Sequence, residues 1–265
     1  MLEIKDVHKT FNPGTINEKK ALSGVNLTLN DGDFVTVIGG NGAGKSTLLN
    51  MITGVYPVDK GRIILDGADI TKLPEHKRAK FLGRVFQDPM TGTSGGMQID
   101  ENLAIAARRG KFRSLLPGVT KKEKEEFKTL LKKLDLGLEN RLSSKVGLLS
   151  GGQRQAVTLL MASMQNPKLL LLDEHTAALD PQTAAKVLAL TEEIVSESKI
   201  TTLMITHNMK DAIRLGNRLI MMNNGQIIYD ISGEEKKKLQ VSDLMELFAK
   251  ASSGEFANDR MLLGQ

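Results

Sequence analysis

A glycine-rich loop followed by a lysine and a serine lies near the start of the chain. Residues 39–46 read Gly-Gly-Asn-Gly-Ala-Gly-Lys-Ser, which is the spacing of a phosphate-binding loop. The glycines would let successive backbone N–H groups turn toward phosphates at a helix N-terminus, and Lys45 could reach the β- and γ-phosphates. The pattern predicts that a nucleoside triphosphate binds, and it leaves GTPases, kinases and helicases open. The candidate phosphate-binding residues are Gly39, Gly40, Asn41, Gly42, Ala43, Gly44, Lys45, Ser46 and Thr47.

Two carboxylates follow an apolar run farther along the chain. Residues 169–172 are all leucine, and Asp173 and Glu174 come directly after them. Open α/β sheets place their ligand sites at the carboxyl ends of strands. Because adjacent residues on a strand point to opposite sides, we expect Asp173 and Glu174 to have separate functions. Taken alone, the pair is equally typical of a cap for the next helix.

A second candidate anion site precedes these carboxylates. Residues 148–155 read Leu-Leu-Ser-Gly-Gly-Gln-Arg-Gln. The Ser150 side chain and the N–H groups of Gly151 and Gly152 would cap a helix that begins here, which would give the chain another helix end suited to anions. An ordinary helix N-cap is the alternative.

The order of these motifs resembles that of the ABC ATPases, and the resemblance covers nearly the whole chain. Residues 148–155 are similar to the signature sequence of that family, and residues 169–174 are similar to its Walker B element. Three residues match further motifs of the family: Gln87 the Q-loop, Asp180 the D-loop and His207 the switch histidine. Phe11 matches the aromatic residue that stacks on adenine, with a core phenylalanine as the alternative.

The resemblance implies ATP and Mg²⁺ as cofactors and ATP hydrolysis as the reaction. Ser46, Gln87 and Asp173 would hold the metal. Glu174 would polarise the attacking water, while His207 and Gln87 keep its geometry. A binding module without catalysis would lack the carboxylate that Glu174 supplies.

The resemblance also implies partners. Two copies would pair head to tail, with each ATP between the glycine loop of one copy and the signature of the other. The signature residues concerned are Ser150, Gly151, Gly152 and Gln153. Transmembrane permease subunits and an extracytoplasmic solute-binding protein would complete an importer on the cytoplasmic face of the cell membrane. Residues 174–180 are similar to a bacterial subgroup associated with amino-acid uptake. The rival is a soluble ABC ATPase of the iron–sulfur assembly type.

One position departs from the family pattern. The family usually has proline after the catalytic glutamate, and this chain has His175. Proline would have held Glu174 extended and removed a backbone donor. Harmless loop variation is one interpretation, and a protonated His175 that perturbs Glu174 is the other.

Strands and helices alternate in the order that these motifs need. Apolar patterns predict strands at residues 2–7, 21–29, 34–38, 169–172, 202–205 and 219–222, with the first two forming an antiparallel edge. They predict helices at residues 45–53, at 103–107 and 127–134, and from Asp180-Pro181 onward. Asn224-Gly225 predicts a hairpin turn.

We therefore predict an α/β fold of the P-loop NTPase (ABC ATPase) kind, with an antiparallel β edge and a helical signature subdomain. The whole chain, 1–265, would form a single domain. Residues 1–86 and 148–231 would be its core, 87–147 the helical subdomain with the Q-loop, and 232–265 a C-terminal helix and tail. Residues 88–99 are rich in Gly, Thr and Met, which is typical of an adaptable contact.

The composition of the chain excludes several further kinds of site and partner. There is no cysteine, which excludes disulfides and thiolate metal sites. The formal charge of +5 is a mild surplus, and lysines alternate with acids, so a nucleic-acid partner is not expected. No apolar run reaches the ~18 residues of a membrane span, so any membrane connection is expected to come through a partner.

Overall fold

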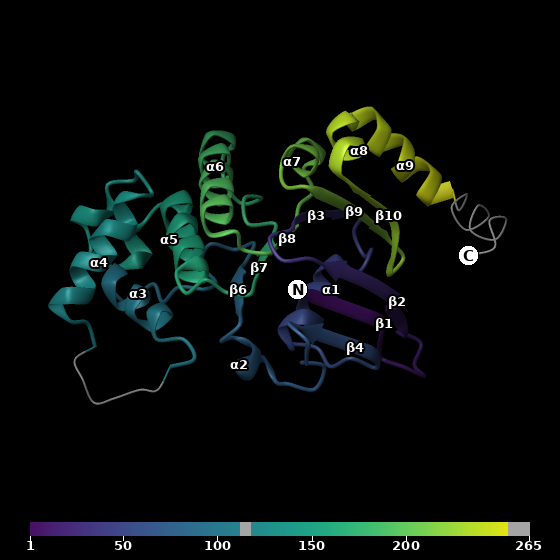
Figure 1. Cartoon of the computed structure of the whole chain (residues 1–265), viewed down its shortest axis with the longest axis horizontal. Coiled ribbons are helices and arrows are strands. Elements are labelled where there is room, and N and C mark those ends of the chain that lie inside the picture. The colour runs from purple at the N-terminus through teal and green to yellow at the C-terminus, as the bar shows by residue number, and fades with distance from the viewer. Residues whose placement is uncertain (112–117, 254–265) are drawn as a thin grey trace. The chain divides into compact units, whose positions relative to one another are not determined.

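The computed structural model describes residues 1–111 and 118–253, with side chains described as far as residue 250. The chain forms two compact units (Figure 1). The first contains residues 1–75 and the described residues from 201 onward, and the second contains residues 76–200. Residues 112–117 of the expected helical subdomain and 254–265 of the expected tail lie outside the described residues. The predicted limits of core and helical subdomain stay a prediction.

The antiparallel β edge predicted at the start of the chain is confirmed. In the first unit β1 pairs antiparallel with both β2 and β4. Leu2, Ile4 and Val7 of β1 are buried, which gives this sheet its apolar face. The strands, in the order β2-β1-β4-β5, are β1 (Leu2–Phe11), β2 (Lys19–Leu29), β4 (Lys60–Leu65) and β5 (Ala68–Asp69).

The predicted parallel strands of the first unit are also confirmed. There β3 (Phe34–Gly39) is buried along its whole length and pairs in parallel with β8 (Thr202–Ile205) and β9 (Arg218–Asn223). After β3 the chain enters the glycine loop and then α1 (Lys45–Thr53). The Asn224-Gly225 hairpin joins β9 to β10 (Gln226–Ser232), and both turn residues have the positive φ that such turns require.

The C-terminal part differs from the single helix that the sequence predicts. In the described part of the chain two helices follow β10, namely α8 (Gly233–Lys238) and α9 (Val241–Ser253). The helix breaks because Leu239 takes an extended backbone, and the buried Lys236 donates to the carbonyl oxygens of Leu215 and Gly216 just after α7 (Met209–Arg214). Leu244 of α9 packs into a cluster with Ile38, Ala212, Leu219, Met221 and Ile231.

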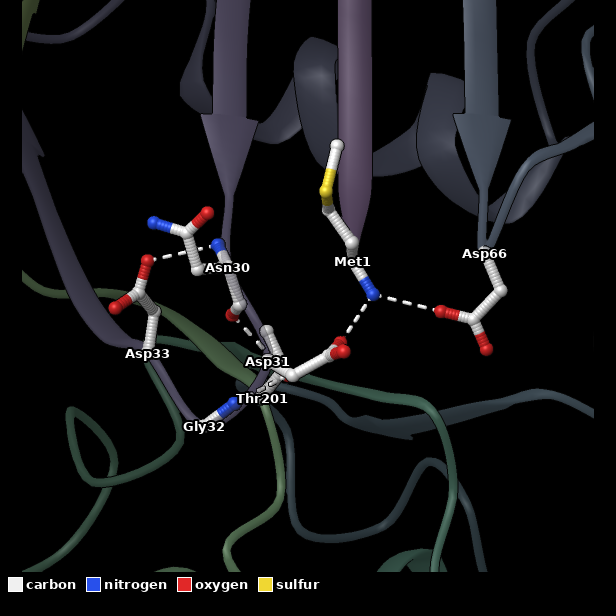
Figure 2. A network of polar contacts seen from close by, with 7 residues as sticks. All are labelled: Met1, Asn30, Asp31, Gly32, Asp33, Asp66 and Thr201. Atoms are coloured by element: carbon white, nitrogen blue, oxygen red, sulfur yellow. Dashed lines mark hydrogen bonds and ion pairs between the residues drawn. The ribbon is translucent and has the colours of Figure 1, made fainter.

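A polar network fastens the start of β1 to the segment that leads into β3 (Figure 2). The Met1 amine contacts the carboxylates of Asp31 and Asp66, the latter at 2.6 Å. The Gly32 N–H donates to the Thr201 hydroxyl at 3.0 Å, immediately before β8. These contacts connect the antiparallel sheet to the entry of the strand that delivers the glycine loop.

The second unit contains a parallel strand pair and most of the helices. Strands β6 (Leu82–Val85) and β7 (Leu169–Asp173) are paired with Leu82 opposite Leu169. The predicted helical character of the insert is confirmed by α3 and α4, and the helix from Pro181 by α6. The helices are α2 (Glu75–Arg78), α3 (Ile99–Ala107), α4 (Lys121–Lys132), α5 (Gly151–Ser163) and α6 (Pro181–Ser198), with 3₁₀ turns η1 (Leu138–Asn140) and η2 (Val146–Leu148).

Candidate functional site

The glycine loop joins β3 directly to α1, as the sequence predicts. A Cβ atom at Gly39 would lie 2.4 Å from the Met222 carbonyl oxygen, and one at Gly44 would lie 2.6 Å from the Ala21 carbonyl oxygen. Gly44 also has a φ of 101°, which side-chain-bearing residues avoid. Glycine is therefore required at both ends of the loop. No side chain caps the first turn of α1, and an uncapped helix N-terminus is suited to an anion.

Lys45 is held over this loop. Its side chain is buried, and Nζ donates to the carbonyl oxygens of Gly39 at 2.7 Å and Gly40 at 3.1 Å. Ser46, by contrast, is exposed. The ammonium is thus oriented by the loop, and the residue that follows it is exposed.

Phe11 is the last residue of β1, whereas the strand predicted from the sequence ends at residue 7 and leaves Phe11 in the loop after it. The strand continues to this point because Phe11 still pairs with Lys19 of β2. Its ring lies edge-on to Tyr56, with the ring centroids 5.2 Å apart, and Lys9 Nζ lies 5.7 Å from the Phe11 centroid. The ring is half-buried. The edge contact fixes the ring without covering it completely, which a stacking platform also requires.

His207 follows β8 with one residue between them and is exposed. The next residue, Asn208, caps α7 by accepting from the N–H groups of Lys210 and Asp211. The histidine is therefore held between the end of a buried strand and a capped helix.

In the second unit β7 ends at Asp173, and Glu174 leaves the strand. Glu174 has a φ of 48° and begins a turn in which the Ala177 N–H donates to its carbonyl oxygen. The argument from strand alternation was therefore wrong for Glu174, because a left-handed residue does not continue the pleat. A proline at position 175 would favour an extended backbone at Glu174 and would therefore oppose the observed turn. His175 places no such restriction on Glu174.

Asp173 makes a contact that the sequence did not reveal. Its Oδ2 lies 3.2 Å from Arg84 Nη2 on the neighbouring strand β6. The Arg84 guanidinium lies 4.5 Å from the centre of the Phe86 ring. The carboxylate predicted to bind Mg²⁺ is therefore already paired with a cation of this chain.

His175 is completely buried beside α6. Its Nε2 lies 3.0 Å from the Thr191 hydroxyl, which itself donates to the Val187 carbonyl oxygen at 2.8 Å. The hydroxyl must then accept from His175, which assigns the hydrogen to Nε2. Burial lowers the pKa of His175 to about 4. The ring is neutral near pH 7, so the hypothesis of a protonated His175 acting on Glu174 is wrong there.

The burial of neutral His175 predicts a pH-dependent stability. The unfolded chain takes up this proton below about pH 6.5, whereas the folded chain does so only below about 4. The contribution of neutral His175 to the free energy of unfolding is therefore complete above pH 6.5 and is lost as the pH falls toward 4. Between pH 7 and 5 we expect the free energy of unfolding to fall by about 2 kcal/mol more in the unaltered chain than in His175→Leu, measured by urea denaturation.

His76 offers a matched control, since it is exposed on α2. His76→Leu should keep the pH dependence of the unaltered chain. An equal loss of stability on acidification in His175→Leu would show that His175 is not buried as a neutral ring.

Ser150 caps α5, as predicted. Its hydroxyl accepts from the Gln153 N–H at 3.3 Å, and the Gln153 side chain accepts in turn from the Ser150 N–H at 3.2 Å. A Cβ at Gly152 would lie 2.0 Å from Thr183 Cγ2 of α6, so glycine also permits the close packing of the two helices. The signature segment thus has a structural function in this unit, whatever it binds.

Asp180 caps α6 in the same manner, with Pro181 at the first helical position. The Thr183 N–H donates to Asp180 Oδ1 at 3.1 Å, and hydrogen bonding by Thr183 lowers the pKa of this carboxyl group. The predicted N-cap is confirmed.

The segment after Gln87 is fastened to the signature helix. Gln87 itself is exposed just beyond β6. The Phe86 carbonyl oxygen accepts from Gln155 Nε2 at 3.0 Å, and the buried Arg154 donates from Nε to the Thr93 hydroxyl at 2.7 Å. The Gly, Thr and Met composition of residues 88–99 therefore does not imply that the segment lacks fixed contacts. The contacts of Arg154 and Gln155 were not predicted because their partners lie 61 and 69 residues away in the chain.

The predicted site residues are divided between the two units. The first holds the glycine loop, Phe11 and His207, and the second holds Gln87, Asp173, Glu174, the signature residues and Asp180. Within residues 1–111 and 118–253, no cluster of three or more His, Cys, Asp or Glu side chains could hold a metal ion. No helix in those same residues is both long and apolar enough to span a membrane.

The parallel strands and the glycine loop at the N-terminus of α1 define a nucleotide-binding α/β protein. The ABC transporter family model matches residues 22–177, more than half of the sequence, and the chain belongs to that family. It is an ATP-binding subunit whose hydrolysis of ATP serves transport. The iron–sulfur assembly alternative is not supported.

Relatives and solved structures agree with this assignment. The chain is 45% identical to the tyrosine transport ATP-binding protein of Clostridioides difficile, over 95% of this chain and all of that protein. It is 33% identical to a phosphonates import ATP-binding protein of Lactobacillus acidophilus, over 92% of this chain and 94% of that protein. A dimeric, post-hydrolysis ATP-binding cassette bound to ADP and Pi is similar, with a TM-score of 0.74, 29% identity and coverage of 88% of this chain and 98% of that one.

Proposed function

We propose that this subunit powers the import of an amino acid through a separate membrane permease, and that tyrosine is the first solute to test. The observation that carries the proposal is the glycine loop with Lys45 oriented over it, in a chain 45% identical to a tyrosine transport subunit along almost its entire length. Import is the direction named for the phosphonate relative.

The proposed reaction is attack of water on the γ-phosphate of ATP, which forms a bond between the water oxygen and phosphorus, breaks the bond to the β-phosphate oxygen, and releases ADP and inorganic phosphate. The N–H groups of residues 40–46 and Lys45 bind the phosphates and offset their charge. Glu174 accepts the proton of the attacking water, and Gln87 and His207 orient that water and the γ-phosphate. Phe11 stacks on the adenine. The left-handed backbone of Glu174 supports its part, since strained residues cluster at functional sites.

Mg²⁺ fits the donors that the sequence assigns to it. Ser46 is an exposed residue that carries a hydroxyl, Gln87 is an exposed residue that carries an amide, and Asp173 has a carboxylate at a strand end. Mg²⁺ prefers oxygen ligands and is usually held by one or two carboxylates together with phosphates of the substrate. When bound, the ion supplies charge neutralisation at the phosphates.

The proposed assembly is a homodimer that closes on ATP. Each copy presents the capped N-terminus of α5, with Ser150, Gly151, Gly152 and Gln153, to the ATP held by its partner. The dimeric cassette among the similar structures supports this arrangement. Permease subunits would hold the dimer at the cytoplasmic face of the membrane, and an extracytoplasmic protein would deliver the solute.

The assembly is tested by capture from gently solubilised native membranes. We expect a membrane protein with several spans to be retained with this subunit, identified by mass spectrometry. Capture of soluble partners alone would contradict the transporter assembly.

The solute is tested separately by uptake of radiolabelled tyrosine in cells that lack this subunit. We expect uptake to fall and to be restored by the unaltered chain but not by Lys45→Ala. If these cells take up tyrosine normally but fail to take up another solute, the transporter assignment stands and tyrosine is rejected as the solute.

A further inference from the structure

The pairing of β6 with β7 places a cation beside the proposed metal ligand. Arg84 lies directly opposite Leu171 in the parallel register, and Asp173 is two residues beyond Leu171 on the same face. The long arginine side chain extends past Leu171, so that Nη2 lies 3.2 Å from Asp173 Oδ2. The contact follows from strand register and not from proximity in sequence.

This ion pair is more protected than an ordinary surface pair. Both side chains are only 15% exposed, whereas fully solvated pairs contribute little because water screens them. The guanidinium also stacks over the Phe86 ring at 4.5 Å, and its Nε is buried without a hydrogen-bond partner in the described part of the chain. Phe86 and the strand pairing therefore confine Arg84 to the neighbourhood of Asp173.

We propose that Arg84 is a positioning residue that binds the Asp173 carboxylate and competes with Mg²⁺ for it. The inference rests on the proposed function, in which Asp173 is a ligand of Mg²⁺. A carboxylate that already faces a guanidinium presents less negative charge to a second cation, and the two cations repel each other across it. Arg84 thereby limits how much Mg²⁺ strengthens nucleotide binding, and it keeps the carboxylate paired when the metal leaves.

The test compares the affinity of the purified chain for AMP-PNP in excess EDTA with its affinity in saturating Mg²⁺, by calorimetry. The ratio of the two affinities measures the gain that Mg²⁺ provides. In Arg84→Gln we expect this gain to rise by about tenfold, because the competing charge is removed. Arg84→Lys should keep the gain near that of the unaltered chain, since it retains a cation.

Two controls separate the possible outcomes. Arg141→Gln removes the same charge from an exposed position of the second unit and should leave the gain unchanged. Arg84→Met is a second neutral variant, to be used if thermal unfolding shows that Arg84→Gln folds poorly. It is expected to raise the gain from Mg²⁺ in the same way. An unchanged or reduced gain in the folded neutral variants would overturn the competition.

Asp173→Asn distinguishes failure of this inference from failure of the proposed function. If Asp173 is a metal ligand, its replacement should abolish most of the gain from Mg²⁺. Loss of the gain in Asp173→Asn with no effect of Arg84→Gln would reject only the role of Arg84. An unaltered gain in Asp173→Asn would reject Asp173 as a ligand of Mg²⁺, and with it the part of the proposed function on which this inference rests.

Discussion

Replacing Glu174 by glutamine is expected to slow ATP hydrolysis by roughly a hundred- to ten-thousandfold, the range that a general base contributes. Glutamine keeps the length and hydrogen-bonding shape of the side chain but cannot accept a proton from water. The turn at residues 174–177 should persist, because glutamine tolerates the left-handed backbone about as well as glutamate does. Affinity for ATP should therefore remain close to that of the unaltered chain.

Phosphate release and equilibrium ATP binding, measured on the same preparation, check this expectation. Glu193 provides a matched control, since it is exposed on α6 and Glu193→Gln removes the same charge. Hydrolysis within a factor of about three of normal in Glu174→Gln would remove Glu174 from the proposed reaction, since a general base contributes far more. Loss of ATP binding in the same variant would point to a role in folding or in the nucleotide site instead.

The second large effect is expected for Lys45. Lys45→Met should weaken ATP binding by roughly a hundredfold, which corresponds to a charge-assisted contact of about 3 kcal/mol. Methionine fills much of the buried volume of the lysine stem, but it cannot donate to the phosphates or to the carbonyl oxygens of Gly39 and Gly40. A modest loss of thermal stability should accompany the loss of binding.

Binding of a fluorescent ATP analogue and thermal unfolding measure the two effects separately. Lys72→Met changes the same charge at an exposed position of the first unit and should affect neither. Unaltered ATP affinity in a folded Lys45→Met protein would contradict the proposed role of the glycine loop.

Local sequence was sufficient for features whose determinants are adjacent in the chain. The glycine loop between β3 and α1, the caps at Ser150 and Asp180 and the hairpin at Asn224-Gly225 were all predicted, because each depends on the conformation of a few consecutive residues. Alternating and continuous apolar runs predicted β1, β2, β3, β7, β8 and β9 for the same reason, whereas β4, β5 and β6 were not predicted.

The ends of helices and strands that are set by the backbone conformation of one residue were predicted less well. Glu174 was placed on the strand, although its φ of 48° ends the pleat one residue earlier. A single C-terminal helix was expected, whereas extended backbone at Leu239 divides it into α8 and α9. Composition does not reveal such breaks, because tertiary contacts such as those of Lys236 decide between nearly equal local conformations.

The motifs of an ABC ATPase can be recognised without a structure, since each motif is contiguous and their order along the chain can be read directly. The fold was needed to show that Asp173 is paired with Arg84, that His175 is neutral against Thr191 and that Arg154 holds the segment after Gln87. These contacts join residues between 16 and 89 positions apart. The register of β6 with β7, the turn after β7 beside α6, and the contact of α5 with the segment after Gln87 create them, and none of these follows from neighbouring residues in the chain.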